Sequence, residues 1–317
     1  MQCIPTAADT NLINQFKGDQ KCLGTAERFL IEANKIPNMR FRLESLIMKD
    51  DMVDDIKMMK RNIDLINEAS MQIRNSYSLR ICMCIALYIG NILNQGTFRA
   101  AANAFKIEDL LKFKELRANS QFKSQTLLNF LDFYMESFNE NTSQSLKNEL
   151  NSVNLASVLS TNTLLQDLDK WRSQISNVYC ECLEHLKTPS IQKNLAFYHK
   201  MSDFCKDTTR EIEKLADILH DAQNQNNCTI LHFNLDPADV TIESLESDLA
   251  TFLSSLQRAH SDNSAQDGLY NSLKLNSSKK ASLEPGNQTA SLKATSNRSQ
   301  FERTIKDLHS ATFRLHS

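Results

Sequence analysis

Apolar side chains recur at alternating steps of three and four residues over most of this chain, with polar side chains between them. This spacing places one apolar stripe along a helix. The clearest stripe is interrupted only by Ser70 and comprises Met52, Ile56, Met59, Ile63, Ile66 and Ile73. Helix breakers are scarce, because no glycine lies between Gly96 and Asp267 and the only prolines there are Pro189 and Pro237. The sequence therefore predicts an all-α protein with long helices.

Two further stripes flank Pro189 and predict a pair of long helices. The first runs through Leu164, Leu168, Trp171, Ile175, Val178 and Cys182, and the second through Ile191, Leu195, Tyr198, Cys205, Thr208, Ile212, Leu215 and Leu219. Proline lacks a backbone N–H and disfavours helix in the residue before it, so the chain is expected to turn at Pro189. The two helices should pack antiparallel as an elongated coiled-coil arm.

Other helices are predicted on either side of this arm. Thr25 is placed to cap a short helix near the start, and Thr241 to cap a late amphipathic helix with the stripe Leu245, Leu249, Phe252, Leu256 and Ala259. Residues 79–93, LRICMCIALYIGNIL, are apolar on nearly every face. A helix of that kind is expected to be surrounded by others. We therefore predict that residues 79–93 form the central core helix.

Composition changes after residue 262. Residues 263–317 contain ten serines, five asparagines and few large apolar side chains, with eight basic against four acidic residues. Such a segment buries too little apolar surface to offset the entropy of ordering it. We predict a folded domain over residues 1–262 and a disordered, Ser/Asn/Lys-rich tail over residues 263–317.

Overall charge and cysteine content limit which partners and which cellular compartment fit this sequence. The chain has 36 basic and 38 acidic residues, a formal net charge of −2, so no global field favours nucleic acid or an anionic membrane. The N-terminal residues lack the pattern of a signal peptide, and no stretch of eighteen apolar residues occurs. Most of the eight cysteines fall in apolar helical patterns rather than in a loop-rich disulfide framework. These features predict a cytoplasmic protein with reduced thiols and no membrane insertion.

Residues 90–131, GNILNQGTFRAAANAFKIEDLLKFKELRANSQFKSQTLLNFL, resemble the signature stretch of the formin homology 2 domain. The family pattern is a buried helix ending in Gly-Asn-x-x-Asn, a loop, a Gly-Phe-Lys-like turn, a short helix with basic residues, and Thr-Leu-Leu. The matching residues are Gly90, Asn91, Asn94, Gly96, Phe105, Lys106, Leu110, Leu111, Lys112, Thr126, Leu127 and Leu128. Residues 22–48 resemble the family's knob and residues 233–260 its C-terminal helix, so the resemblance covers about residues 1–262.

The resemblance implies an elongated helical domain made of a knob remnant, the coiled-coil arm and a compact part called the post. It also implies a cytoskeletal protein that binds actin at filament barbed ends and acts in filament nucleation and elongation without a cofactor. In the family a lasso, upstream of the part matched here, wraps the partner's post and closes a dimer, so we expect a homodimer only if a lasso exists. A single copy should bind filament ends weakly. The chain departs from the pattern at Ala104, where glycine is usual, and by a short insertion between Arg117 and Thr126.

Two groups of residues are the candidate site. The cations at Lys106, Lys112, Lys114, Arg117 and Lys123 would steer an acidic actin surface, although the interleaved Glu108 and Asp109 would also suit an ordinary solvated helix face. The residues Gly90, Asn91, Asn94, Gly96 and Phe105 are, by resemblance, the post pocket that receives an apolar lasso anchor. Alternatively, their glycine and amide groups simply permit close backbone approach and satisfy a helix end. In the tail, Asp267, Leu269 and Leu273 loosely resemble the autoregulatory motif of diaphanous-type formins.

Catalytic and metal-binding patterns are not expected. The sequence has no Gly-rich phosphate loop, no H-E-x-x-H and no G-x-S-x-G. Cys180, Cys182 and His185 could suggest a metal site. A Cys-x-Cys pair on a helix, however, directs its two thiols to different faces, so core packing is the favoured interpretation.

The alternative to actin binding is a formin-derived scaffold that binds another protein through its arm. Charge reversal at Lys112 and Arg117 distinguishes the two.

Overall fold

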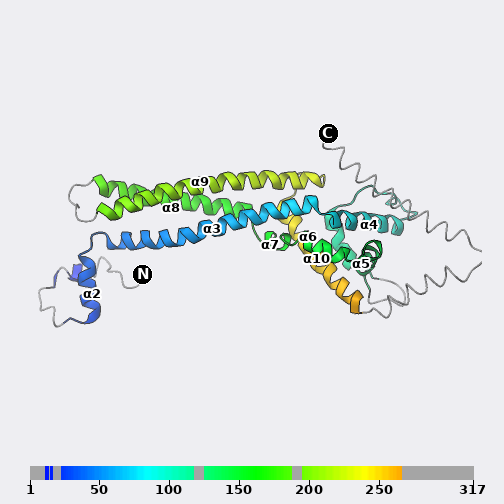
Figure 1. Ribbon diagram of the computed structural model, residues 1–317, viewed down its shortest axis with the longest axis horizontal. Coiled ribbons are helices and arrows are strands. Elements are labelled where there is room, and N and C mark those ends of the chain that lie inside the picture. Colours follow the sequence, from blue (N-terminus) through cyan, green and yellow to red (C-terminus); the bar gives the residue numbers. More distant parts are fainter. Residues whose placement is uncertain (1–10, 14, 17–22, 118–124, 188–194, 266–317) are drawn as a thin grey trace, which may run out of the picture. The chain divides into compact units, whose positions relative to one another are not determined.

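The computed structural model describes residues 11–13, 15–16, 23–117, 125–187 and 195–265, and this part of the chain is helical without strands. The principal helices are α2 (Thr25–Asn34), α3 (Met39–Asn75), α4 (Tyr77–Leu93), the 3₁₀ helix η2 (Ile107–Lys114), α5 (Leu127–Phe138), α6 (Thr142–Glu149), α7 (Val153–Ala156), α8 (Thr161–Lys187), α9 (Leu195–His232) and α10 (Ile242–Ala265) (Figure 1). The all-α prediction is confirmed.

The chain divides into two compact units, and α3 and α9 contribute to both. The first unit comprises Met1–Ile63 and Thr161–Asp221, and the second comprises Asp64–Ser160 and Ala222–Ser317. The first unit therefore holds α2, the first part of α3, α8 and most of α9. The second holds the end of α3, the end of α9 and all the remaining helices.

The first unit contains the predicted coiled-coil arm, formed by α8 and the first part of α9, together with α2 and the first part of α3. Within it α8 and the first part of α9 lie side by side (Figure 1). The predicted stripes are mostly buried, with Ile175 on α8 and Ile212 on α9 each 1% exposed. The His185 and Tyr198 rings, at the end of α8 and the start of α9, have centroids 4.8 Å apart, so the two helices are antiparallel. The turn at Pro189 lies outside the described residues.

Polar contacts and a cation–π contact join the start of α3 to the end of the arm where α8 meets α9. Asn38 has a left-handed backbone, with a φ of 53°, and its Nδ2 lies 3.0 Å from His185 Nε2 and 3.3 Å from the Tyr198 hydroxyl. The Arg42 guanidinium stacks on the Phe197 ring at 4.7 Å.

The start of α2 differs from the prediction. Thr25 was expected to cap this helix, but the N-cap is Gly24. Gly24 has an extended backbone, with a φ of −66° and a ψ of 175°, and makes no side-chain cap.

The second unit contains one hydrophobic core built from α4, η2, α5, α6, α7, α10 and the ends of α3 and α9. The stripe predicted for α10 is buried throughout, and the backbone N–H of Ser244 donates to the Thr241 hydroxyl at 3.3 Å, so the predicted cap is confirmed. On α4 the residues Leu79, Ile81, Cys82, Ile85, Ala86 and Ile89 are buried in this core. The opposite face is less covered than predicted, since Leu93 is 61% exposed. Described helices therefore bury one side of α4 and cover the other side only in part.

A carboxylate on α6 fixes the start of α4. The hydroxyl of Ser76 donates to Glu149 Oε2 at 2.6 Å, while the N–H and hydroxyl of Ser78 donate to Oε2 at 3.0 Å and to Oε1 at 2.6 Å. Burial alone would raise the pKa of Glu149, but these bonds and one from the Tyr77 N–H outweigh it and lower the pKa. Glu149 thus satisfies donors that the first turn of a helix leaves open.

No single described helix is both long and apolar enough to span a membrane. Met39–Asn75 and Tyr77–Leu93 meet that length and composition test only when taken together, across a bend of 52°.

Candidate functional site

The end of α4 is held by an amide clasp. Asn91 Nδ2 donates to the Ala102 carbonyl at 2.9 Å, and the Ala102 N–H donates to Asn91 Oδ1 at 2.8 Å. Asn94 is the C-cap and contributes its backbone, because its N–H bonds to the Gly90 carbonyl at 3.0 Å. Asn91 therefore closes the loop between α4 and Phe105, which places the chain for η2.

The two glycines of this motif differ in role. Gly96 has a φ of +84°, a conformation that side chains with a Cβ rarely adopt, so the turn after α4 requires glycine. A Cβ on Gly90 would meet nothing within 4 Å. The expected close approach of another backbone to Gly90 is therefore not made by the described part of the chain. The half-buried Phe105 packs against the core of the second unit.

The basic residues are displayed by η2, whose geometry follows from its sequence. A 3₁₀ helix has three residues per turn, so Ile107, Leu110 and Phe113 share one face, and all three are buried. This anchored face packs on α5 and α10. In the other two rows Leu111 is half-buried and packs against the core, whereas Glu108, Lys112 and Lys114 are exposed. Exposed cations follow along this segment at Lys106, Lys112, Lys114 and Arg117.

Asp109 organises the cations at the start of this segment. Its Oδ2 accepts the backbone N–H of Lys106 at 3.2 Å, and its Oδ1 accepts Lys112 Nζ at 2.6 Å. The hydrogen bond with Asp109 raises the pKa of Lys112, while the charge of Arg99 acts in the opposite direction. Arg99, which sequence reasoning missed, is therefore a neighbour of Lys112. We call Arg99, Lys106, Lys112, Lys114 and Arg117 the basic surface.

Backbone contacts join the two ends of the loop that follows the basic surface. Arg117 and Thr126 form an isolated antiparallel bridge, and the Leu127 N–H donates to the Leu116 carbonyl at 2.7 Å. The side chain of Asn129 accepts the N–H and hydroxyl of Thr126 at 2.9 and 2.8 Å, which caps α5. Four of the five predicted cations are thus brought onto one exposed segment. Lys123, like Asp267, Leu269 and Leu273 in the tail, lies outside the described residues.

An aromatic surface on α5 was not predicted. Phe130, Tyr134 and Phe138 are 48%, 39% and 41% exposed, and their spacing of four residues places them on one side of the helix. The Phe130 and Tyr134 rings have centroids 5.3 Å apart. Burial and the nearby Tyr134 raise the pKa of Tyr88 on α4, so this aromatic surface adjoins the less covered face of α4. Exposed aromatic side chains that cluster in this way are typical of interaction sites.

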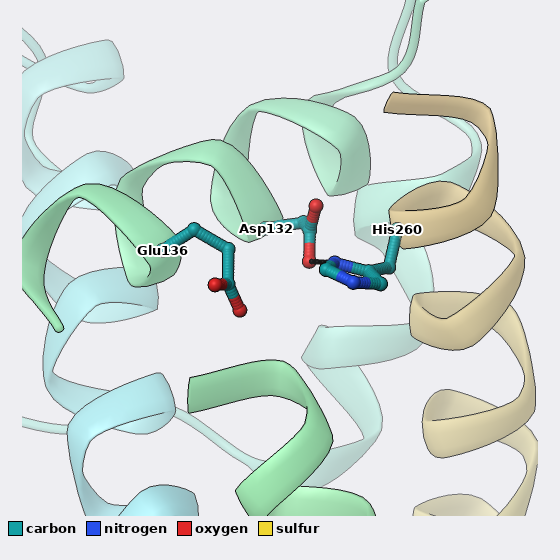
Figure 2. A group of neighbouring side chains, drawn as sticks. All are labelled: Asp132, Glu136 and His260. Atoms are coloured by element: carbon teal, nitrogen blue, oxygen red, sulfur yellow. Dashed lines mark hydrogen bonds and ion pairs between the residues drawn. The ribbon is translucent and has the colours of Figure 1, made fainter. Parts of the chain in front are cut away.

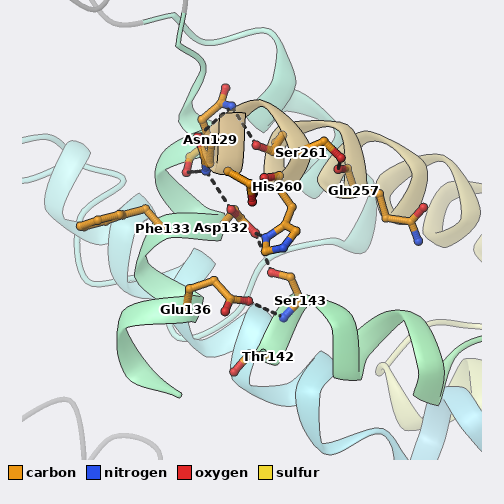
Figure 3. Close-up of polar contacts among 12 residues, drawn as sticks. Asn129, Asp132, Phe133, Glu136, Thr142, Ser143, Gln257, His260 and Ser261 are labelled. Atoms are coloured by element: carbon orange, nitrogen blue, oxygen red, sulfur yellow. Dashed lines mark hydrogen bonds and ion pairs between the residues drawn. The ribbon is translucent and has the colours of Figure 1, made fainter. Parts of the chain in front are cut away.

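A buried polar network lies beneath α5, at its contact with α6 and α10 (Figure 3). Asp132 Oδ1 accepts the Ser143 hydroxyl at 2.6 Å and lies 3.0 Å from His260 Nδ1, while Oδ2 accepts Asn263 Nδ2 at 2.8 Å. Glu136 accepts the backbone N–H groups of Asn141 and Ser143, at the start of α6, at 2.7 and 2.9 Å. No sequence signal connects Asp132 to His260, because 128 positions separate them.

Cys180 and Cys182 do not form a ligand pair. The Cys180 side chain is exposed, whereas Cys182 is buried in the arm. Burial, followed by the Glu181 charge, raises the pKa of Cys182 to about 11. His185 instead contacts Asn38 and Tyr198. Cys182 therefore serves helix packing as expected and His185 joins the contacts at the end of the arm, whereas the core packing expected for Cys180 is not observed.

An all-α fold with an exposed basic segment beside an exposed aromatic surface is typical of a protein-interaction domain. The family model described as Formin Homology 2 Domain matches residues 1–257. The chain belongs to the formin homology 2 domain family, and the resemblance drawn from residues 90–131 is confirmed.

Curated relatives agree with this assignment. Over 83% of its length the chain is 26% identical to Formin-like protein 6 of Oryza sativa subsp. japonica and 28% identical to Formin-like protein 13 of Arabidopsis thaliana. Over 85% of its length it is 26% identical to Formin-like protein 16 of Arabidopsis thaliana. The chain spans 19%, 20% and 37% of these three proteins, respectively, so it corresponds to one part of each.

Proposed function

We propose that this chain is the actin-binding part of a formin and that it contacts actin through the basic surface. The single observation that carries the proposal is the placement of Lys106, Lys112, Lys114 and Arg117 on an exposed segment anchored by Ile107, Leu110 and Phe113. A fixed display of cations costs little ordering entropy when a partner binds. It also speeds encounter with an acidic surface.

The proposed role is positional rather than catalytic and uses no cofactor. Two copies would hold actin subunits in a filament-like arrangement, which lowers the entropic cost of nucleation, and would then remain at the barbed end as subunits add. Such a role needs two linked contacts, because linkage makes the second contact intramolecular. A single copy should therefore bind filament ends weakly. The protein would work at the actin cytoskeleton.

Pairing would use the end of α4 and the aromatic surface. The sequence motif Gly90, Asn91, Asn94, Gly96 and Phe105 corresponds to the family's post pocket, which receives an apolar lasso anchor. The exposed side of α4 beside Tyr134 supports the same location, because exposed apolar side chains there gain from being covered. Gly90 has open space around it that another chain could enter.

The proposal is tested by reversing two charges, Lys112→Glu together with Arg117→Glu. Both side chains are exposed, so the variant should fold normally. In high-speed cosedimentation with excess filamentous actin, we expect the pelleted fraction of the double variant to fall at least fivefold. The reason is that each reversal replaces attraction to an acidic surface with repulsion from it, which weakens association.

A matched control reverses Lys206 and Lys214 on α9. Each of these lysines, like Lys112, pairs with an acidic residue three positions earlier and is exposed. This control should pellet with actin as the unmodified chain does. Equal binding by the Lys112/Arg117 variant and the unmodified chain would reject the basic surface as the contact. A loss confined to the control would instead indicate that actin contacts the arm.

A further inference from the structure

Three potential metal ligands from two helices converge in the second unit. Asp132 and Glu136, four residues apart on α5, point toward His260 on α10, and one ligand atom from each lies within 4.8 Å of the others (Figure 2). Ligand atoms around a tetrahedral Zn²⁺ with bonds of about 2.1 Å lie about 3.4 Å apart. The Asp132 and His260 atoms are 3.0 Å apart, so only Glu136 needs a side-chain adjustment of about 1 Å.

In the described part of the chain, neither carboxylate of this group forms an ion pair with a lysine or arginine. The Asp132 side chain is 1% exposed, and Glu136 is half-buried. Within the described residues, no lysine or arginine forms an ion pair with either carboxylate, and their polar partners are the neutral groups of Ser143, Asn263, Asn141 and the imidazole of His260. Two carboxylates held close together favour a bound cation. His260 adds a nitrogen ligand that suits Zn²⁺ better than Mg²⁺ or Ca²⁺.

Supporting hydrogen bonds for the ligands are already in place. Asn263 and Ser143 orient Asp132, and two backbone N–H groups orient Glu136. Such outer contacts fix the ligands of metal sites. A cavity of about 140 Å³ touches His260, the one proposed ligand among its lining residues, and is also lined by Ser143, Gln144, Lys147, Gln257 and Ser261. This volume holds several waters beside the imidazole.

We propose that Asp132, Glu136 and His260 bind a divalent transition-metal ion of the Zn²⁺ type and thereby fasten α10 to α5. Metal ions bind imidazole and carboxylate groups in their deprotonated forms, so protons compete with the ion for these ligands. The proposal rests on these three residues alone and is independent of actin binding.

The test is Zn²⁺ titration of the 317-residue chain by calorimetry at pH 7.5, with thermal unfolding as a second readout. His260→Gln keeps an amide donor for Asp132 but removes the imidazole, and Glu136→Gln keeps an acceptor for the α6 N–H groups but removes the charge. We expect one Zn²⁺ per chain, and at least a tenfold loss of affinity in each variant. Zn²⁺ at about 100 times its Kd should raise the midpoint temperature of thermal unfolding of the unmodified chain by roughly 5 to 10 °C.

Controls separate this site from other ligands. His199→Gln removes an exposed imidazole on α9 and should leave Zn²⁺ binding unchanged. Thermal unfolding without metal checks that each variant is folded. Zn²⁺ held by cysteine thiols would bind the His260→Gln and Glu136→Gln variants as tightly as the unmodified chain. That result, a loss in only one of these variants, or no stoichiometric binding would overturn the proposal.

Discussion

Glu246→Gln should stabilise the protein at alkaline pH by several kcal/mol. Glu246 lies on α10 and is 1% exposed, and its Oε1 has no hydrogen-bond partner in the described part of the chain. Burial, followed by the nearby Glu243, raises the pKa of Glu246 from 4.5 to about 8. The folded protein therefore keeps this carboxyl protonated at neutral pH. Ionising it in place would put an unpaired charge in the core, which is costly.

The direction in which stability changes with pH follows from the unfolded-state and folded-state pKa values of Glu246. Because the folded-state pKa is the higher one, the stability that Glu246 contributes is fully present below about pH 4.5 and is lost as the pH rises through about 8. One pKa unit corresponds to about 1.4 kcal/mol, so the total loss is on the order of 5 kcal/mol. A glutamine side chain remains neutral at every pH, so the variant should match the unmodified chain at pH 4.5 and exceed its free energy of unfolding at pH 8.5.

Urea unfolding at pH 4.5, 6.5 and 8.5 measures this difference. Asp262→Asn, which removes an exposed negative charge from the same helix, is the control and should leave the pH dependence unchanged. If the Glu246→Gln variant and the unmodified chain lose stability in parallel between pH 4.5 and 8.5, Glu246 does not carry the buried proton.

Glu149→Ala should destabilise the protein by about 3 kcal/mol, because the substitution removes several hydrogen bonds to one charged group. The Ser76 hydroxyl and both donors of Ser78 would lose their acceptor, and both serines are 4% exposed, so water cannot readily replace it. The start of α4 would no longer be held by α6. Glu149→Gln, which keeps one acceptor oxygen, should cost about half as much.

Denaturant titration at pH 7 is the measurement for this series. Glu140→Ala, at an exposed position between α5 and α6, is the control and should change stability by less than about 0.5 kcal/mol. The lowered pKa of Glu149 adds a second test. Its contribution is present above the ordinary glutamate pKa and is lost as the pH falls through the lower folded-state value. Equal stability of the Glu149→Ala and Glu140→Ala variants would show that the capping carboxylate is dispensable.

Periodicity was enough to predict the long helices and much of the core, whereas the short helices α6 and α7 were not predicted. The stripes of α8, α9 and α10 are buried as expected, because a helix with one apolar side leaves few choices for packing. The spacing of Ile107, Leu110 and Phe113 already contains the three-residue period of η2. That period explains why the neighbouring lysines face outward.

Contacts between distant parts of the chain could not be predicted in this way. The Asp132–His260 contact and the capture of Ser76 by Glu149 join positions 128 and 73 residues apart, and no local pattern encodes such pairs. The partial exposure of α4 was missed for a related reason. A sequence shows that a helix is apolar on all sides, but it does not show whether the same chain supplies the covering for each side.

The most direct test of the account is zero-length carbodiimide cross-linking of the chain to filamentous actin, followed by mass spectrometry. This reagent joins a lysine amine to a carboxylate in contact with it, so it captures weak complexes and reports which lysines lie at the contact. We predict actin cross-links at Lys106, Lys112 or Lys114. Cross-links only at arm lysines such as Lys170, Lys206 and Lys214, or none to actin, would contradict the proposal that the basic surface binds actin.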